Sequence, residues 1–232
     1  MIEHIPAAHR YVNRMGFLTT AHLFSFADYY DPKNVHFGAL RVFNDDTIAA
    51  HSGFPNHPHA DMEIVTIVLE GELVHKDNMG NRGVIAAGEV QYMSAGLGVI
   101  HAETNESAAP VHLYQIWIMP RVQGLVPAYA QKDFNGLLQQ NALTKLISGN
   151  ANTESLVMQA DAIIYRGLLD AENKITHICN SGFGVFVYVT TGSLQINGVT
   201  AEEGDQLRIT GDQKIEILAH KNSDFILIEA AC

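Results

Sequence analysis

The sequence has few of the features that mark disulfide-bonded, membrane-spanning or nucleic-acid-binding proteins. Its two cysteines, Cys179 and Cys232, form no Cys-x-x-Cys pair, which excludes a disulfide framework and makes the reducing cytoplasm the expected compartment. No run reaches the ~20 apolar residues of a membrane helix, and the N-terminus has no apolar core of signal-peptide length. With 14 basic residues against 25 acidic ones and a formal net charge of −11, we expect no direct contact with nucleic acid and none with a membrane.

A pattern of short β-strands is present instead. Segments such as 22–32 and 36–50 alternate apolar and polar residues and end in turn residues. The 19 glycines fit a chain with many tight turns, and a hydrophobic content of 47% is ordinary for a globular protein. The sequence therefore predicts an all-β, antiparallel fold of the sandwich or barrel type.

The strand pattern fades in the middle of the chain. Residues 126–152 are rich in Gln, Asn and Ala, and we interpret them as a linker with a turn or two of helix. Strand character then returns and continues to the end. The expected division is an N-terminal domain over residues 1–125 and a C-terminal domain over residues 153–232.

The second domain resembles a weak copy of the first. Each half has a strand, a glycine, a second strand, a turn, and then a glycine followed by an acidic residue. The matching positions are Gly71 with Gly192, Gly88 with Gly204, and Glu89 with Asp205. An internal repeat of this kind predicts two similar β-barrels in one chain.

Two pairs of residues in the first half have the spacing of a metal site. His57 and His59 lie two positions apart, with Pro58 favouring an extended chain between them, so both imidazoles point to one side. His101 and Glu103 repeat this spacing. If neighbouring strands bring the pairs together, three histidines and one carboxylate would suit Fe, Mn, Co, Ni, Cu or Zn, with two positions of an octahedral metal open for substrate or O₂.

The other histidines show no such pattern. Alignment on the repeated glycines places Ile178 and Asn180 where His57 and His59 stand, so we expect no metal in the second barrel. His75 lies near the motif but lacks a same-face partner. Six further histidines are interpreted as surface residues: His4, His9, His22, His36, His112 and His220.

These motifs resemble the pirin family of the cupin superfamily. The similarity is carried by HPHADMEIVTIVLEGELVHKDNMGN (57–81) and AGEVQYMSAGLGVIHAETN (87–105), and is closest to bacterial pirin-like proteins with quercetinase activity. It implies a bicupin, with two antiparallel barrels facing each other. It also implies that the N-terminal barrel carries one divalent metal, which in pirins is most often Fe(II), with Mn, Ni, Co, Cu or Zn as alternatives.

The resemblance leaves a choice between two carboxylates. The general cupin pattern would use Glu63 with His57, His59 and His101, whereas the pirin pattern uses Glu103. We take Glu103, because the resemblance is to pirins and because Glu103 shares the spacing of the histidine pair. Glu63 is then expected to be a structural or supporting residue.

The function implied is oxygen-dependent cleavage of a flavonol such as quercetin, with O₂ as co-substrate and release of carbon monoxide. Glu103 would then act as catalytic base on the 3-hydroxyl proton as well as metal ligand. One alternative is a pirin-type regulatory protein that senses metal or redox state and acts through a protein partner. Another is a cupin with non-redox metal chemistry, such as an isomerase. The oligomeric state stays open.

Overall fold

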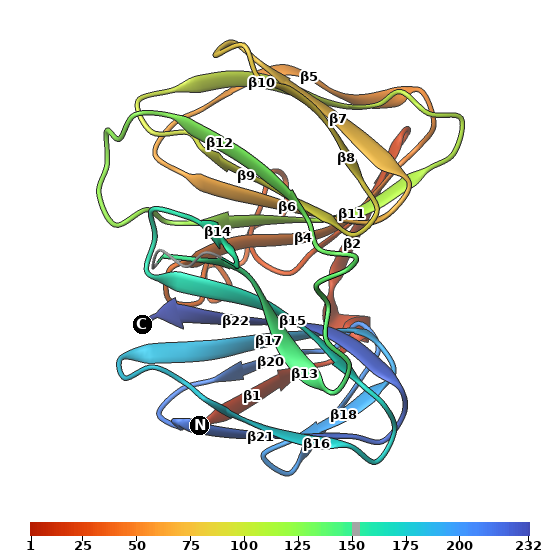
Figure 1. Cartoon of the computed structure of the whole chain (residues 1–232), viewed down its shortest axis with the longest axis vertical. Helices are drawn as coiled ribbons and strands as arrows, with labels where there is room; N and C mark the ends of the chain where they lie inside the picture. The colour runs from red at the N-terminus through yellow and green to blue at the C-terminus, as the bar shows by residue number, and fades with distance from the viewer. Residues whose placement is uncertain (150–153) are drawn as a thin grey trace.

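The structure is a computed structural model that describes residues 1–149 and 154–232, and it consists almost entirely of β-strands. Figure 1 shows four sheets stacked along the long axis, with a small sheet at each end and two large sheets in the middle. One small and one large sheet form each barrel. The prediction of an all-β bicupin with two barrels facing each other is confirmed.

The first barrel contains most of the N-terminal half. Its large sheet has the order β12 (Ala128–Asp133), β9 (Glu89–Ser94), β6 (Glu63–Glu70), β11 (Val111–Ile118), β4 (Leu40–Ile48), β3 (Leu18–His22) and β2 (Tyr11–Met15). Its small sheet has the order β5 (Ser52–His59), β10 (Val99–Asn105), β7 (Glu72–Asp77) and β8 (Arg82–Ala86).

The second barrel repeats this arrangement. Its large sheet has the order β1 (Ile2–Ile5), β20 (Gln206–Ile209), β17 (Phe183–Thr191), β22 (Ser223–Ala231), β15 (Ala162–Leu169), β13 (Ala142–Ser148) and β14 (Leu156–Val157). Its small sheet has the order β16 (Lys174–Ile178), β21 (Lys214–Ala219), β18 (Ser193–Ile196) and β19 (Val199–Glu202). A single-turn 3₁₀ helix, η1 (Ala7–His9), follows β1.

The predicted repeat is present in the strand order. The run β9-β6-β11-β4-β3 of the first barrel corresponds to β20-β17-β22-β15-β13 of the second, and both small sheets follow one order. Gly71 and Gly192 make equivalent turns, from β6 into β7 and from β17 into β18, with φ of 75° and 93°. A Cβ on Gly192 would lie 2.4 Å from the carbonyl oxygen of Asn222, so the turn needs glycine for space as well as for conformation.

The expected domain boundaries differ from those of the structure. The segment interpreted as a linker with helix forms strand β12, which pairs with β9, and strand β13, which pairs with β15. Its described part, up to residue 149, contains no helix. Residues 150–153, at the end of the expected linker and the start of the expected second domain, lie outside the described residues. Strand β1 was expected in the first domain but pairs with β20 of the second barrel.

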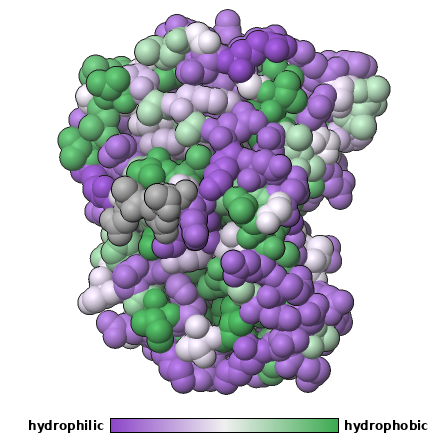
Figure 2. Space-filling view, viewed as in Figure 1, coloured by the Kyte–Doolittle hydropathy of each residue, from purple (hydrophilic) through white to green (hydrophobic). Residues whose placement is uncertain are grey.

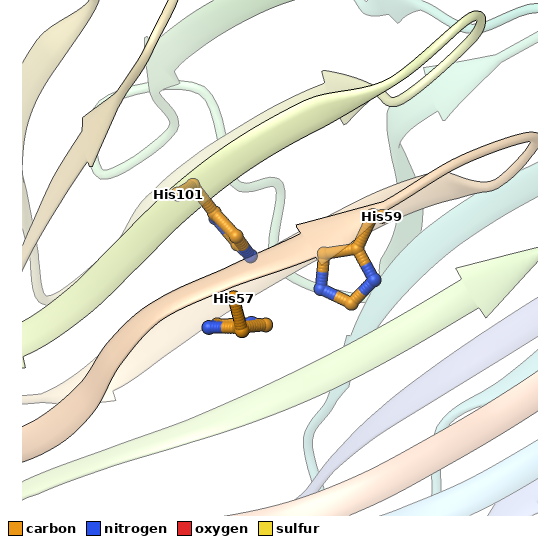
Figure 3. Close-up of side chains that lie close together, drawn as sticks. All are labelled: His57, His59 and His101. Carbon is orange, nitrogen blue, oxygen red and sulfur yellow. The ribbon is translucent and has the colours of Figure 1, made fainter.

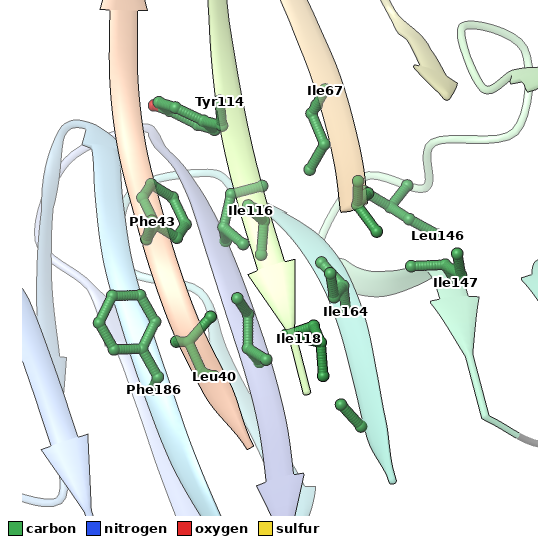
Figure 4. Close-up of a cluster of buried hydrophobic side chains, with 14 of the residues drawn as sticks. Leu40, Phe43, Ile67, Tyr114, Ile116, Ile118, Leu146, Ile147, Ile164 and Phe186 are labelled. Carbon is green, nitrogen blue, oxygen red and sulfur yellow. The ribbon is translucent and has the colours of Figure 1, made fainter. Parts of the chain in front are cut away.

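A continuous hydrophobic core joins the two barrels. Alternate residues of a strand point to opposite faces, so each large sheet turns one face into its own barrel and the other toward the second barrel. Figure 4 shows side chains from both large sheets meeting, including Phe43 and Ile116 of the first and Ile164 and Phe186 of the second. The barrels therefore share one buried interface.

Polar contacts across this interface centre on Asp45. Its carboxylate accepts hydrogen bonds from His112 Nε2 at 2.6 Å and from the Tyr188 hydroxyl of the second barrel at 2.6 Å. Arg10 Nη1 lies 3.5 Å from the same carboxylate. The hydrogen bond to Asp45 raises the pKa of His112, so His112 is not the plain surface residue that we expected.

This pair predicts a pH-dependent stability. Because the folded-state pKa of His112 is raised, its contribution is present below the unfolded value and is lost as the pH rises through the folded value. From about pH 6 to about pH 9, wild type should lose more free energy of unfolding than His112→Gln. Denaturant unfolding of both proteins across this window measures the difference, and parallel curves would contradict it.

The face of the molecule drawn in Figure 2 is mainly polar. On the face drawn in Figure 2, hydrophilic residues predominate and hydrophobic residues form several separate groups. Val126, Tyr30 and Leu97 are the most exposed large hydrophobic residues in the described loops of the first barrel. No helix in the described part of the chain is long and apolar enough to cross a membrane.

Candidate metal centre and its pocket

Three imidazoles converge inside the first barrel. His57 and His59 lie on β5 and His101 on β10, and their ligand atoms all fall within 4.8 Å of one another. The ring centroids are 4.4 Å apart for His57 and His101, and 4.9 Å apart for His59 and His101 (Figure 3). The spacing of two residues within β5 thus places both imidazoles on one side, as predicted.

The register of the small sheet produces this convergence. His101 is the direct partner of His57 in the antiparallel pairing of β10 with β5. The register shifts between His101 and Glu103, because β5 contributes one extra residue there. Bulges of this kind occur next to functional sites, where they re-aim a side chain. Here the shift places Glu103 opposite Phe54.

Hydrogen bonds indicate which nitrogen of His57 and of His101 faces the centre. His57 Nδ1 donates to the carbonyl oxygen of Pro55 at 2.8 Å, which leaves Nε2 with a free lone pair. His101 Nδ1 lies 3.4 Å from His75 Nδ1, and His75 Nε2 lies 3.1 Å from Asp77 Oδ2. If Asp77 accepts the Nε2 proton of His75, then His75 Nδ1 can accept the proton of His101 Nδ1.

Asp77 is well suited to anchor this chain. Its carboxylate accepts hydrogen bonds from the backbone of Met79 and Asn81 and from the Asn81 side chain. Burial opposes the charge of Asp77, but the hydrogen bonds from Asn81 and His75 lower its pKa overall. His101 is left with a buried Nε2 that has no hydrogen-bond partner among the described residues.

A metal cation fits this arrangement. Burial, together with neighbouring imidazoles, lowers the pKa of His59 to about 4 and that of His101 to about 3, so both rings are in the neutral form that metals bind. A cation among the three rings would give His101 Nε2 the partner it lacks. Orientation of a ligand imidazole by a hydrogen bond to its other nitrogen is common in metal sites.

Glu103 lies beside this centre and belongs to a second group. Its carboxylate forms a cluster with His101 and His75 in which all ligand atoms lie within 4.8 Å. Glu103 Oε2 accepts a hydrogen bond from Gln115 Nε2 at 2.9 Å, and Thr66 Oγ1 lies 3.1 Å from Gln115 Oε1. His101 therefore belongs to both groups. Glu103 does not belong to the three-histidine group, because its carboxylate oxygens are not within 4.8 Å of the ligand atoms of all three histidines.

Glu63 lies elsewhere. Its carboxylate accepts hydrogen bonds from the Tyr92 hydroxyl, from Ser94 Oγ at 2.6 Å and from the backbone N–H of Gln159 at 2.8 Å. Gln159 belongs to the second half of the chain. Glu63 is thus a buried link to that half, in keeping with the structural role expected for it.

A cavity of about 380 Å³ opens beside the three histidines. Its apolar lining consists of Phe26, Phe54, Pro55, Ile64 and Trp117. Its polar lining consists of Asn44, Asp46, His57, His59, His101, Glu103 and Gln115. The pocket is a mainly apolar slot with polar groups on both walls, as expected of a small-molecule site.

Several of these residues were not predicted. Asn44 and Asp46 come from β4, and Gln115 and Trp117 from β11, and nothing local in the sequence marks them. His75 was judged to have no same-face partner, which is wrong. Its partner Asp77 stands two residues along the strand and would have been found by searching for carboxylates.

One more of the histidines that we expected at the surface, His22, is buried in the structure. Its Nδ1 lies 2.8 Å from Asn44 Oδ1, so His22 supports the pocket wall and does not face solvent. In the second barrel, His177 Nε2 lies 2.9 Å from Glu229 Oε1.

Comparison with known proteins identifies the family. Residues 7–118 match the family described as Pirin, and residues 145–230 match the quercetinase C-terminal cupin domain. The chain is 43% identical over 215 residues to a quercetin 2,3-dioxygenase of Escherichia coli, which covers 92% of each protein. The chain belongs to the pirin family. This pirin is also 39% identical over 217 residues to a pirin-like protein of Caulobacter vibrioides, covering 93% of this chain and 94% of the relative.

A solved structure supports the fold of this pirin. The crystal structure of the bacterial pirin YhhW of Escherichia coli in complex with nickel(II) matches it with a TM-score of 0.94 and 41% identity. The match covers 100% of this chain and 99% of that one. The resemblance drawn from the histidine motifs is therefore confirmed at the level of family and fold.

Proposed function

We propose that this pirin is a metal-dependent dioxygenase that cleaves quercetin or a similar flavonol with O₂. The observation that carries the proposal is the position of three converging imidazoles on the wall of an apolar pocket that also contains a buried carboxylate. The similarity to a protein named quercetin 2,3-dioxygenase, at 43% identity, supports the same conclusion.

His57, His59 and His101 would hold the metal, with Glu103 as the fourth ligand. Three imidazoles and one carboxylate suit Fe(II), Mn, Co, Ni, Cu and Zn alike. We propose Fe(II) as the first candidate, because pirins are most often associated with Fe(II). Nickel is the second candidate, because the structure of a related pirin has been solved in complex with nickel(II). A bound divalent cation would supply a Lewis acid that stabilises an anionic enolate form of the substrate.

The protein's own groups would position and deprotonate the substrate. A flat flavonol would lie against the aromatic rings of Phe26, Phe54 and Trp117, which line the cavity. Glu103 is the carboxylate placed to accept the proton of the 3-hydroxyl group. The hydrogen bond from Gln115 fixes the orientation of Glu103 during this step.

The test is oxygen uptake by the same preparation with and without metal. Protein stripped of metal and then reloaded with Fe(II) or Ni(II) is mixed with quercetin, and O₂ consumption and carbon monoxide release are recorded. We expect both only in the reloaded protein. A stoichiometric metal content without O₂ uptake would overturn the dioxygenase and favour the regulatory alternative, in which a protein partner reads the metal state. Loss of quercetin without O₂ uptake would favour non-redox chemistry.

His75 gives a further prediction about the metal. His75→Leu removes the acceptor for His101 Nδ1 while preserving the volume of a buried side chain. Loss of such an orienting group weakens metal binding by about 10–100-fold. Competition with a chelator of known affinity measures the change. Exposed His51 provides the control, and equal affinities for His75→Leu and His51→Leu would contradict the prediction.

A further inference from the structure

The cavity beside the three histidines has two buried polar atoms that the metal does not explain. Among the described residues, Asp46 Oδ1, Trp117 Nε1 and His101 Nε2 are buried without hydrogen-bond partners, and all three residues line this one cavity. A metal would satisfy His101. Asp46 and Trp117 lie on the large sheet, across the cavity from β5 and β10.

A carboxyl group in this position is costly for the fold. Asp46 is 4% exposed, and its neighbours on the adjoining strands are Thr20 and Leu113. Leu113 belongs to a buried apolar cluster of the first barrel. The hydroxyl of Thr20 hydrogen-bonds the carboxyl group, but Oδ1 has no partner in the described part of the chain. A buried acceptor without a donor destabilises the folded state unless a ligand supplies the donor.

We propose that Asp46 is a substrate-binding residue whose carboxyl group accepts a hydrogen bond from a hydroxyl group of a substrate bound in this pocket. The ligand class is then an aromatic molecule that carries a hydroxyl donor besides the enol placed at the metal. The proposal rests on the proposed function in taking a flavonol as ligand.

The position of Asp46 distinguishes it from Glu103. Glu103 already accepts a hydrogen bond from Gln115 and shares a cluster of potential metal ligands with two histidines. Asp46 is absent from both clusters of potential metal ligands among the described residues. Burial, with the nearby charges of Asp45 and Glu103, raises the pKa of Asp46 to about 7, so the group can also exist as a neutral acid that still accepts a hydrogen bond.

The test compares binding of two flavonols without oxygen. Quercetin carries hydroxyl groups on both ring systems, whereas 3-hydroxyflavone has the 3-hydroxyl alone. Anaerobic titrations of the metal-loaded protein, followed by flavonol absorbance, give both dissociation constants. In wild type we expect quercetin to bind more tightly, and in Asp46→Leu we expect this preference to fall about tenfold, which is the effect of one hydrogen bond to a charged group.

Two variants control for the loss of a buried polar group. Gln91→Leu removes another buried, unpartnered side chain of the same barrel that does not line the cavity, so the preference should stay at the wild-type value. Asp46→Asn keeps an acceptor of the same size and should retain part of the preference. Thermal unfolding of Asp46→Leu should occur close to the wild-type temperature, because removal of the unpartnered Oδ1 offsets the loss of the hydrogen bond from Thr20.

The outcomes separate the two proposals. If Asp46→Leu weakens both flavonols equally, or neither, the role of Asp46 is overturned and the proposed function is untouched. If the preference depends on Asp46 but wild type consumes no O₂ with quercetin, the proposed function is overturned and the binding role remains. If wild type binds neither flavonol, both are overturned.

Discussion

Glu63→Gln should mainly lower the stability of the fold, whereas Glu103→Gln should mainly lower the rate of turnover. Each change replaces a buried carboxylate by an amide of equal size. Glu63 receives donors from Tyr92, Ser94 and Gln159, so one amide N–H would face a donor instead of an acceptor. Leaving buried donors unsatisfied costs about 1–3 kcal/mol each, and we expect a loss of about 3 kcal/mol in the free energy of unfolding.

The same change at Glu103 should leave the fold intact. A glutamine there can still present its carbonyl oxygen to Gln115 Nε2. It cannot accept the substrate proton, and loss of a general base typically lowers the rate by about 10²–10⁴-fold. Steady-state O₂ uptake and denaturant unfolding of both variants measure the two effects. If Glu63→Gln releases the metal while Glu103→Gln retains activity, the assignment of the two carboxylates is wrong.

The histidine positions could be predicted because strand periodicity is local. Two residues at spacing two in an extended chain share a face wherever the strand lies in the sheet. The pairs at 57 and 59 and at 101 and 103 each needed only their own strand to be recognised. The pairing of β5 with β10 could be predicted only with the help of the family resemblance. The sequence of one strand does not show which distant strand it pairs with.

The opposite wall of the pocket could not be predicted for the same reason. Asp46, Gln115 and Trp117 belong to β4 and β11, which face β5 and β10 only after the barrel has closed. Each looks like an ordinary residue of an alternating strand. The unpartnered state of Asp46 is a property of its surroundings, and only the structure reveals it.

The strands inside the expected linker were missed for a similar reason. Strand β12 has a polar sequence of low strand propensity, and β13 follows a Gln- and Asn-rich stretch, but each hydrogen-bonds to a sheet that other strands have formed. Such context outweighs intrinsic strand propensity. Strand β1 pairs with β20, with Ile2 opposite Ile209, a separation that no local pattern could signal.

Replacing both His57 and His59 by alanine should abolish metal binding and O₂ uptake together. The two residues supply half of the four proposed ligands. Sites with four ligands hold a structural metal with about 10–16 kcal/mol, so losing half of this weakens binding more than 10³-fold. Neither side chain is fully buried, so the folded state should persist.

The matched control replaces two exposed histidines, His9 and His220, by alanine. This control also removes two imidazoles, but neither of them lies at the metal centre. Metal content and O₂ uptake should therefore equal those of wild type. Metal analysis after dialysis against a weak chelator, with thermal unfolding to verify the fold, distinguishes the variants. Should the His57 and His59 variant retain one metal per chain, the metal would have to lie in the other cluster, formed by His75, His101 and Glu103. The metal would then be bound deeper in the barrel, and a flavonol in the cavity would have to reach it past the positions of the two lost imidazoles.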